Sequence, residues 1–140
     1  MAFKPVNRFT SNEFHDWQRE NLPGYLIIQD VDHWFMVVSN SQDQYEPKML
    51  VELKRSSYEP ERWAPWEADK PNYVAMWKLA EHAELPFTII YFKKGQPLQR
   101  VAWFAVSDVD ADSREWISYD KEILDLGTLK ARILRITGNR

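Results

Sequence analysis

Four charged residues in the first half of the chain have types and spacing that suit joint chemistry: Asp30, Asp32, Glu52 and Lys54. Two hydrophobic stretches that read as strands, 33–38 and 49–54, are separated by a polar stretch at 39–47. A hairpin loop centred on residue 42 places Asp32 opposite Glu52. The same register places Asp30 opposite Lys54. All four side chains then emerge on one face of the sheet, because their numbers are all even and side chains alternate along a strand.

This arrangement predicts a site for a divalent cation. Carboxylates within a few ångströms of each other repel and raise each other's pKa, and a bound cation removes that penalty. Oxygen ligands favour Mg²⁺ or Mn²⁺, and the chain has no cysteine that would favour zinc. A cation on two carboxylates can hold a phosphate oxygen and lower the pKa of a bound water molecule. Lys54 would then orient or deprotonate that water, or stabilise charge on the phosphate.

The same residues also fit a plainer interpretation, in which they have no chemical role. Glu52 and Lys54 can be the solvated end of a strand, and the two aspartates can be turn residues between strands. We expect only one aspartate to be a ligand, and Asp32 is the better candidate because it leads directly into a hydrophobic strand. Three residues just past Lys54 are either phosphate contacts or ordinary loop residues: Arg55, Ser56 and Ser57.

Hydrophobic periodicity predicts the elements that position these residues. A first helix is expected to begin at Thr10 or Ser11 and to end at Pro23-Gly24. A second helix is expected over 72–84, preceded by a proline-rich irregular loop at 56–71. Strands are expected at 25–29, 33–38, 49–54, 87–92 and 101–106. The order predicts an α/β domain with a mixed β-sheet flanked by helices and covered on both faces.

Composition limits the class of protein. The 140 residues, 44% hydrophobic and 28% charged, suit one globular domain. Without cysteine, disulfide frameworks, iron–sulfur clusters and a cysteine nucleophile are excluded, and a reducing cytosol is favoured. No hydrophobic run approaches a membrane span and no signal-peptide core is visible, so we expect a soluble cytoplasmic protein with no membrane partner.

The distribution of charge gives no clear sign of a nucleic-acid binder. The net charge is −3, yet residues 126–140 hold four basic residues and no acidic one. This basic tail either contacts phosphate or forms an ordinary solvated face. In the proline-rich loop, Trp63 and Trp66 either cover the core or stack on bases.

Other motifs are weaker. The acidic run at 108–112 resembles the start of a calcium loop, but Ser113 replaces the glycine and Tyr119 the final glutamate, so an exposed acidic turn is expected. The three histidines lie on different predicted elements without metal-ligand spacing: His15, His33 and His82.

Asp32, followed twenty residues later by Glu52-Leu53-Lys54, resembles the motif of the PD-(D/E)XK nuclease superfamily. The resemblance spans roughly residues 9–106, with 107–140 as a C-terminal extension of a single domain (1–140). It implies a restriction-endonuclease-like core of a helix, a three-stranded meander, a crossing helix and a further strand. In length and order the chain is most similar to small archaeal Holliday-junction resolvases and phage nucleases.

The resemblance also implies roles for individual residues. Asp32 and Glu52 match the metal ligands and Lys54 the lysine of the motif. Glu13 matches a helix glutamate that completes the metal site in some branches, and its plainer reading is a first-turn helix acid. Three features depart from the family: Val31 replaces the proline, Asn72 or Tyr73 stands near a position where some branches have glutamine, and the chain is acidic whereas the resolvases are usually basic.

The function that the resemblance implies is hydrolysis of DNA phosphodiester bonds by a divalent-metal-dependent endonuclease. Mg²⁺ or Mn²⁺ would be its cofactor, and junction or branched DNA a candidate substrate. One alternative is a silent-site protein of the same fold that binds nucleic acid or a protein partner. Another is a phage or mobile-element structural protein whose acids are merely surface residues. A homodimer is a candidate assembly, because many small nucleases pair two sites to meet two strands.

Overall fold

The structure is a computed structural model that describes residue 13 and residues 16–17, 19–24, 31–38 and 45–138. Its elements in chain order are β1 (His33–Val38), β2 (Tyr45–Ser56), η1 (Glu67–Asp69), α2 (Lys70–Ala83), β3 (Phe87–Lys93), β4 (Arg100–Val109), β5 (Ile117–Asp125) and α3 (Leu126–Ile136). Upstream of them, residues 13, 16–17 and 19–21 are helical. Among the described residues, no helix has the length and hydrophobicity needed to cross a membrane.

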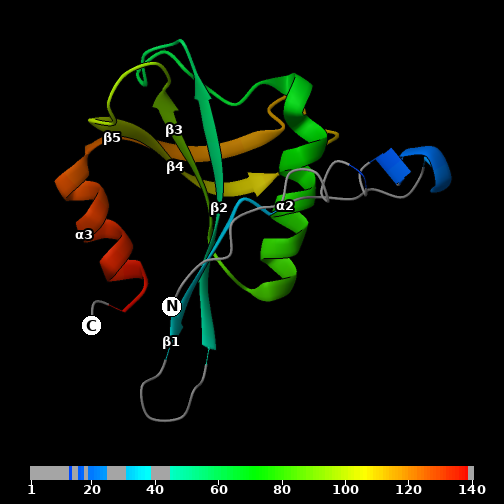
Figure 1. The fold of residues 1–140 in the computed structure, drawn as a ribbon, viewed down its shortest axis with the longest axis horizontal. Helices are drawn as coiled ribbons and strands as arrows, with labels where there is room; N and C mark the ends of the chain where they lie inside the picture. The colour runs from blue at the N-terminus through cyan, green and yellow to red at the C-terminus, as the bar shows by residue number, and fades with distance from the viewer. Residues whose placement is uncertain (1–12, 14–15, 18, 25–30, 39–44, 139–140) are drawn as a thin grey trace.

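The strands form one mixed sheet in the order β1-β2-β3-β4-β5. β1 pairs antiparallel with β2, β2 parallel with β3, and β3, β4 and β5 antiparallel in turn. Because parallel neighbours need a crossover, α2 connects β2 to β3 across one face. Figure 1 shows α2 on one side of the sheet and α3 on the other. The α/β class with a mixed sheet and flanking helices is therefore confirmed.

Both faces of the sheet are packed, and β2 contributes to each through the alternation of its side chains. Leu50 faces α2, where it joins a core that includes Tyr73 and Met76. Met49 and Val51 face α3, in a second core that Leu129 and Ile133 cover. Coverage stops short of the edge strand β1, where Trp34 is 56% exposed. The predicted covering of both faces is thus confirmed for the centre of the sheet but not for this edge.

The helix α2 has clear start and stop signals. Pro71 occupies its first turn, where no backbone hydrogen bond is lost. At its end Glu84 adopts a left-handed conformation with φ of 57°, and Leu85 N–H donates to the Ala80 carbonyl at 2.9 Å. Pro86 follows and prevents further helix. This stop sets the start of β3, whose pairing with β2 begins at Phe87.

Several predicted elements are confirmed, with longer bounds for β2 and β4 than expected. The predicted strand at 25–29 lies outside the described residues. The hairpin loop expected at 39–47 is too long, because 45–47 already belong to β2. No element was assigned to the C-terminal extension from the sequence, and it contains β5 and α3. Asp125 caps α3 by accepting a hydrogen bond from Thr128 N–H at 2.7 Å.

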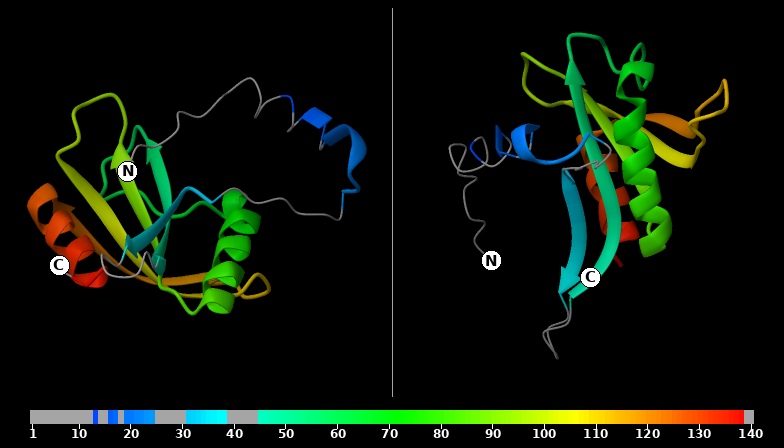
Figure 2. Two further views of the ribbon diagram at one scale, coloured as in Figure 1. Left: turned by 60° about the horizontal axis from the view of Figure 1, so that its bottom comes forward. Right: turned by 90° about the vertical axis from the view of Figure 1, so that its right-hand side faces the viewer.

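The described helical residues near the N-terminus do not pack on the sheet. All of them are exposed, and Trp17 retains 50% exposure. Both Figure 1 and the left view of Figure 2 show this blue segment apart from the sheet, on the side of α2.

Candidate active site

Asp32 and Glu52 meet because β1 and β2 pair in the predicted register. Three cross-strand pairs share it: His33 with Val51, Trp34 with Leu50, and Phe35 with Met49. One step further along the same register, Asp32 falls opposite Glu52. Nearer the loop the register shifts by a β-bulge, and Met36 lies opposite Pro47. The predicted register is therefore correct at the site, whereas nearer the loop the observed pairing differs from it by one residue.

The carboxylate of Asp32 is held by the backbone of β2. The Leu53 N–H donates to Asp32 Oδ2 at 3.0 Å. β1 begins at His33, opposite Val51, while β2 continues to Ser56. Within the described residues no strand therefore lies beside the last part of β2 on this side, and Asp32 supplies an acceptor that a strand would otherwise provide.

Glu52 is a buried carboxyl group with only part of its hydrogen-bonding capacity used. Glu52 is only 5% exposed. Oε1 accepts a hydrogen bond from Asn72 Nδ2 at 3.2 Å and lies 3.8 Å from Lys54 Nζ. Oε2 is buried and has no donor in the described part of the structure. Such an orphaned oxygen is costly unless a proton or a cation occupies the site.

The pKa of Glu52 is raised from 4.5 to about 7. Burial is the largest cause, followed by the negative charge of Asp32 and a hydrogen bond between the two carboxyl groups. Lys54 and Asn72 act in the opposite direction but with smaller effect. Near neutral pH Glu52 therefore takes up a proton, and a cation of higher charge can take its place.

Lys54 lies between two carboxylates. Its Nζ is 3.8 Å from Glu52 Oε1 and 3.7 Å from Asp69 Oδ2, and it lies 5.4 Å from the centroid of the Tyr73 ring. Both distances to oxygen exceed the usual hydrogen-bond range of about 2.7–3.2 Å. The ammonium group is thus positioned by charge and by the aromatic ring, while its three N–H donors make no hydrogen bond within the described residues and can serve a substrate or water.

The first turn of α2 supplies contacts that the sequence analysis did not fully identify. Asn72 was noted beside the position of a family glutamine, and it does reach Glu52. Asp69 was missed. It stands at the N-cap of α2, but its side chain makes no capping hydrogen bond and reaches Lys54 instead. An aspartate directly before Lys70-Pro71 was a usable signal for a helix start, but it gave no indication that Asp69 pairs with Lys54.

Other predicted site residues are not brought to this place. Glu13 is exposed, and the helical residues that follow it lie apart from the sheet (Figure 1). Its role as a ligand stays a prediction. Asp30 lies outside the described residues. Across the described ranges, no group of three or more His, Cys, Asp or Glu side chains is arranged to hold a metal ion.

The two tryptophans of the proline-rich loop differ. Trp63 is 3% exposed and stacks on Tyr91 with ring centroids 4.5 Å apart, so its core role is confirmed. Trp66 is 49% exposed, and its ring centroid lies 6.4 Å from that of Trp63.

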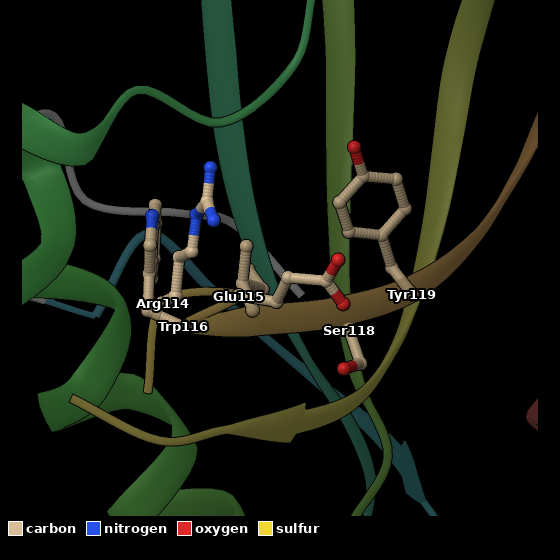
Figure 3. Close-up of a pocket in the computed structure, with 6 residues that line it drawn as sticks. Arg114, Glu115, Trp116, Ser118 and Tyr119 are labelled. Carbon is tan, nitrogen blue, oxygen red and sulfur yellow. The ribbon is translucent and has the colours of Figure 1, made fainter. Parts of the chain in front are cut away.

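Two hollows lie away from the candidate site. One of about 400 Å³ is lined by the consecutive residues 114–119, whose side chains Figure 3 shows along the start of β5. The other, of about 440 Å³, lies between α2 and residues 108–112. The acidic turn expected there begins only at Asp110, because Asp108 and Val109 still belong to β4 and Val109 is buried. Asp110 Oδ1 accepts a hydrogen bond from Asp112 N–H at 3.1 Å, as an acidic turn requires. Neither hollow includes Asp32, Glu52 or Lys54.

Comparisons of the chain with protein-family models, with curated proteins and with solved structures found no match. Its function is therefore inferred from the geometry of this site.

Proposed function

We propose that this protein is a divalent-metal-dependent nuclease that hydrolyses phosphodiester bonds in DNA. The observation that carries the proposal is the buried Glu52 carboxyl group, which has one oxygen without a donor among the described residues and the Asp32 carboxyl group beside it. Lys54 lies two residues further along the same strand, on the same face. The three residues come from one hairpin.

The order of the elements around the site supports a restriction-endonuclease-like core. In that core the strand with the first carboxylate is antiparallel to the strand with the second carboxylate and the lysine. A helix then crosses to a strand parallel to the latter. β1, β2, α2 and β3 have these relations.

The donor set fits a hard divalent cation such as Mg²⁺ or Mn²⁺. Asp32 and Glu52 would hold it, because both present carboxylate oxygens and Glu52 lacks a donor for Oε2 within the described residues. When bound, the cation stabilises the negative charge that develops on the phosphate during hydrolysis. Glu13 remains the predicted third ligand.

The protein's own residues would position the reactants. A charged ammonium can only donate hydrogen bonds, so Lys54 would hold the attacking water through its oxygen or donate to a phosphate oxygen. Asn72 donates to Oε1 of Glu52, which fixes the carboxylate and leaves Oε2 available. Asp69 keeps the Lys54 ammonium near the strand end through its charge.

Nicking of supercoiled plasmid at low salt tests the proposal, with Mg²⁺, Mn²⁺ or EDTA in parallel. We expect nicking that requires metal and falls at least a hundredfold in Glu52→Gln and Lys54→Ala, because each removes a group that acts on the phosphate or its metal. The matched controls are Glu81→Gln and Lys78→Ala, on exposed positions of α2. Metal-independent binding without cleavage of plasmid, junction or single strand would instead identify a silent-site binding protein.

A further inference from the structure

A cleft of about 260 Å³ adjoins the site described above. Its lining residues are Asp32, His33, Leu53, Lys54, Arg55 and Phe92. Two of them, Asp32 and Lys54, belong to the proposed catalytic set. Whatever occupies the cleft therefore lies directly beside the reacting phosphate.

The cleft combines an apolar floor with a cationic rim. Leu53 and Phe92 are partly buried and pack against the core under α3. Arg55 lies opposite Phe92 in the pairing of β2 with β3, so both belong to the α3 face of the sheet. Arg55 is exposed, and it forms no ion pair with any other residue that the structure describes. Its guanidinium group is available for an anion.

The two serines after Arg55 are not placed to contact a phosphate in the cleft. Ser56 Oγ lies 2.7 Å from Tyr91 Oη, and the Tyr91 hydroxyl also donates to the Tyr58 carbonyl at 2.6 Å. Ser56 therefore serves the packing of the loop that follows β2. Ser57 is exposed and does not line the cleft. Of the three candidate phosphate contacts in the sequence, Arg55 alone lines it.

We infer that this cleft binds a single unpaired nucleotide of the DNA strand that is cut, with its phosphate on Arg55 and its base against Phe92 and Leu53. An arginine guanidinium matches phosphate geometry, and aromatic side chains hold bases of any sequence by stacking. Ligand sites commonly measure roughly 300–1,000 Å³, so a cleft of about 260 Å³ holds one nucleotide and not a base pair.

The inference deepens the proposed function and rests on it for the identity of the strand. It predicts that the preferred substrate carries unpaired nucleotides at the cleavage point, as single strands, flaps and branched DNA do. Asp32 is the one acidic residue in the lining, and its charge weakens the phosphate contact, so the affinity without metal is a lower bound for the affinity with a cation bound. His33 stands at the same rim, exposed to solvent.

Binding of a fluorescein-labelled twelve-nucleotide thymidine strand, measured in EDTA over a series of salt concentrations, tests the inference without cleavage. We expect the parent to bind this strand at least tenfold more tightly than the matching duplex. Arg55→Ala should weaken single-strand binding about tenfold and lower the slope of log affinity against log salt by about 0.7, the value for one lost phosphate contact. Arg55→Lys should retain part of the affinity.

Arg62→Ala is the matched control, because Arg62 is an exposed arginine of the loop after β2 that does not line the cleft. Equal losses in Arg62→Ala and Arg55→Ala, or equal affinity of the parent for strand and duplex, would overturn the inference. If the parent nicks DNA but Arg55→Ala binds the single strand as tightly as the parent does, the nucleotide site is refuted and the nuclease proposal stays intact. Loss of binding in Arg55→Ala, with no metal-dependent nicking by the parent, supports the nucleotide site and refutes the nuclease proposal.

Discussion

Glu52 is a carboxyl group that the fold buries beside a second carboxyl group, with one oxygen lacking a donor among the described residues. Without a cation, folding favours the protonated form of this group. With a cation, the same geometry favours the ionised form, since two carboxylates then bind the positive charge. At the proposed site, protonation and metal binding would therefore compete for Glu52.

This competition predicts how stability depends on pH when metal is absent. The folded pKa of Glu52, about 7, lies above its unfolded value of 4.5. The folded state thus binds the extra proton, and the stabilisation is complete below pH 4.5 and lost as the pH rises through 7. Glu52→Gln is always neutral, so at pH 8 it should be more stable than the parent by up to about 3 kcal/mol and equal to it at low pH.

Thermal unfolding in EDTA at a series of pH values measures this difference. Glu81→Gln should follow the parent at every pH, because Glu81 is exposed on α2. Parallel curves for parent and Glu52→Gln would show that Glu52 does not hold the extra proton.

At the scale of elements, the site depends on two units: the β1–β2 hairpin and the start of α2. The hairpin carries Asp32, Glu52 and Lys54, and its register brings Asp32 beside Glu52. α2 then adds Asn72 and Asp69, which orient what the hairpin has assembled. The helix that carries Glu13 is a third unit, whose described residues lie apart from the sheet (Figure 2).

If the first helix contributes a ligand, Glu13 should matter more than another acid of the same helix. Glu20 is the matched control, since it is also exposed and also helical. We expect Glu13→Gln to raise the Mg²⁺ concentration needed for half-maximal nicking about tenfold, in the range typical of groups that support a metal site. Equal effects of Glu13→Gln and Glu20→Gln would contradict a ligand role for Glu13.

The sequence predicts the hairpin better than the surroundings of the site. Its register near Asp32 follows from a polar stretch between two hydrophobic stretches and from the alternation of side chains. The pairing of Asp69 with Lys54 does not follow from any sequence pattern, because it depends on where the start of α2 packs on the sheet. β5 was missed because acids and a lysine interrupt its alternation, and its outer edge has no strand neighbour in the described part of the sheet.

α3 did carry a usable signal. Asp125 directly precedes it as a cap, and Leu129, Ile133 and Ile136 recur at helical spacing and pack on the sheet. The prediction for this stretch rested on its positive charge alone. One of those charges has a structural role: Arg132 pairs with Glu122 and lies 5.5 Å from the centroid of the Trp103 ring.

At the scale of the whole molecule, the two faces of the sheet carry different parts of the proposed site, and these parts adjoin each other at the last part of β2. The proposed catalytic residues lie mainly on the α2 face and the nucleotide cleft on the α3 face, and Asp32 and Lys54 belong to both. The net charge of −3 gives no long-range attraction for DNA. The DNA binding that we propose would therefore come from local contacts and from the proposed cation.

The cation should stabilise the whole domain, because the unfolded chain does not hold the two carboxylates together. At pH 8, Mg²⁺ at about one hundred times its dissociation constant should raise the free energy of unfolding by about 2.7 kcal/mol. As the pH falls below about 7 the gain should shrink, since a proton then occupies Glu52. Thermal unfolding with MgCl₂, against NaCl of equal ionic strength, measures the gain, and Glu52→Ala should show none. A gain of the same size in that variant would place the bound cation elsewhere.

The β-bulge after Phe35 has a consequence for engineering the chain. It lets β1 and β2 keep one register beside Asp32 and another beside the connecting loop. We expect a slip of the pairing at the loop end of the strands to stop at this bulge, so that the three pairs next to Asp32 keep their register. The connection between β1 and β2 is accordingly the place to insert a fluorescent reporter or an affinity tag while the distance between Asp32 and Glu52 is preserved.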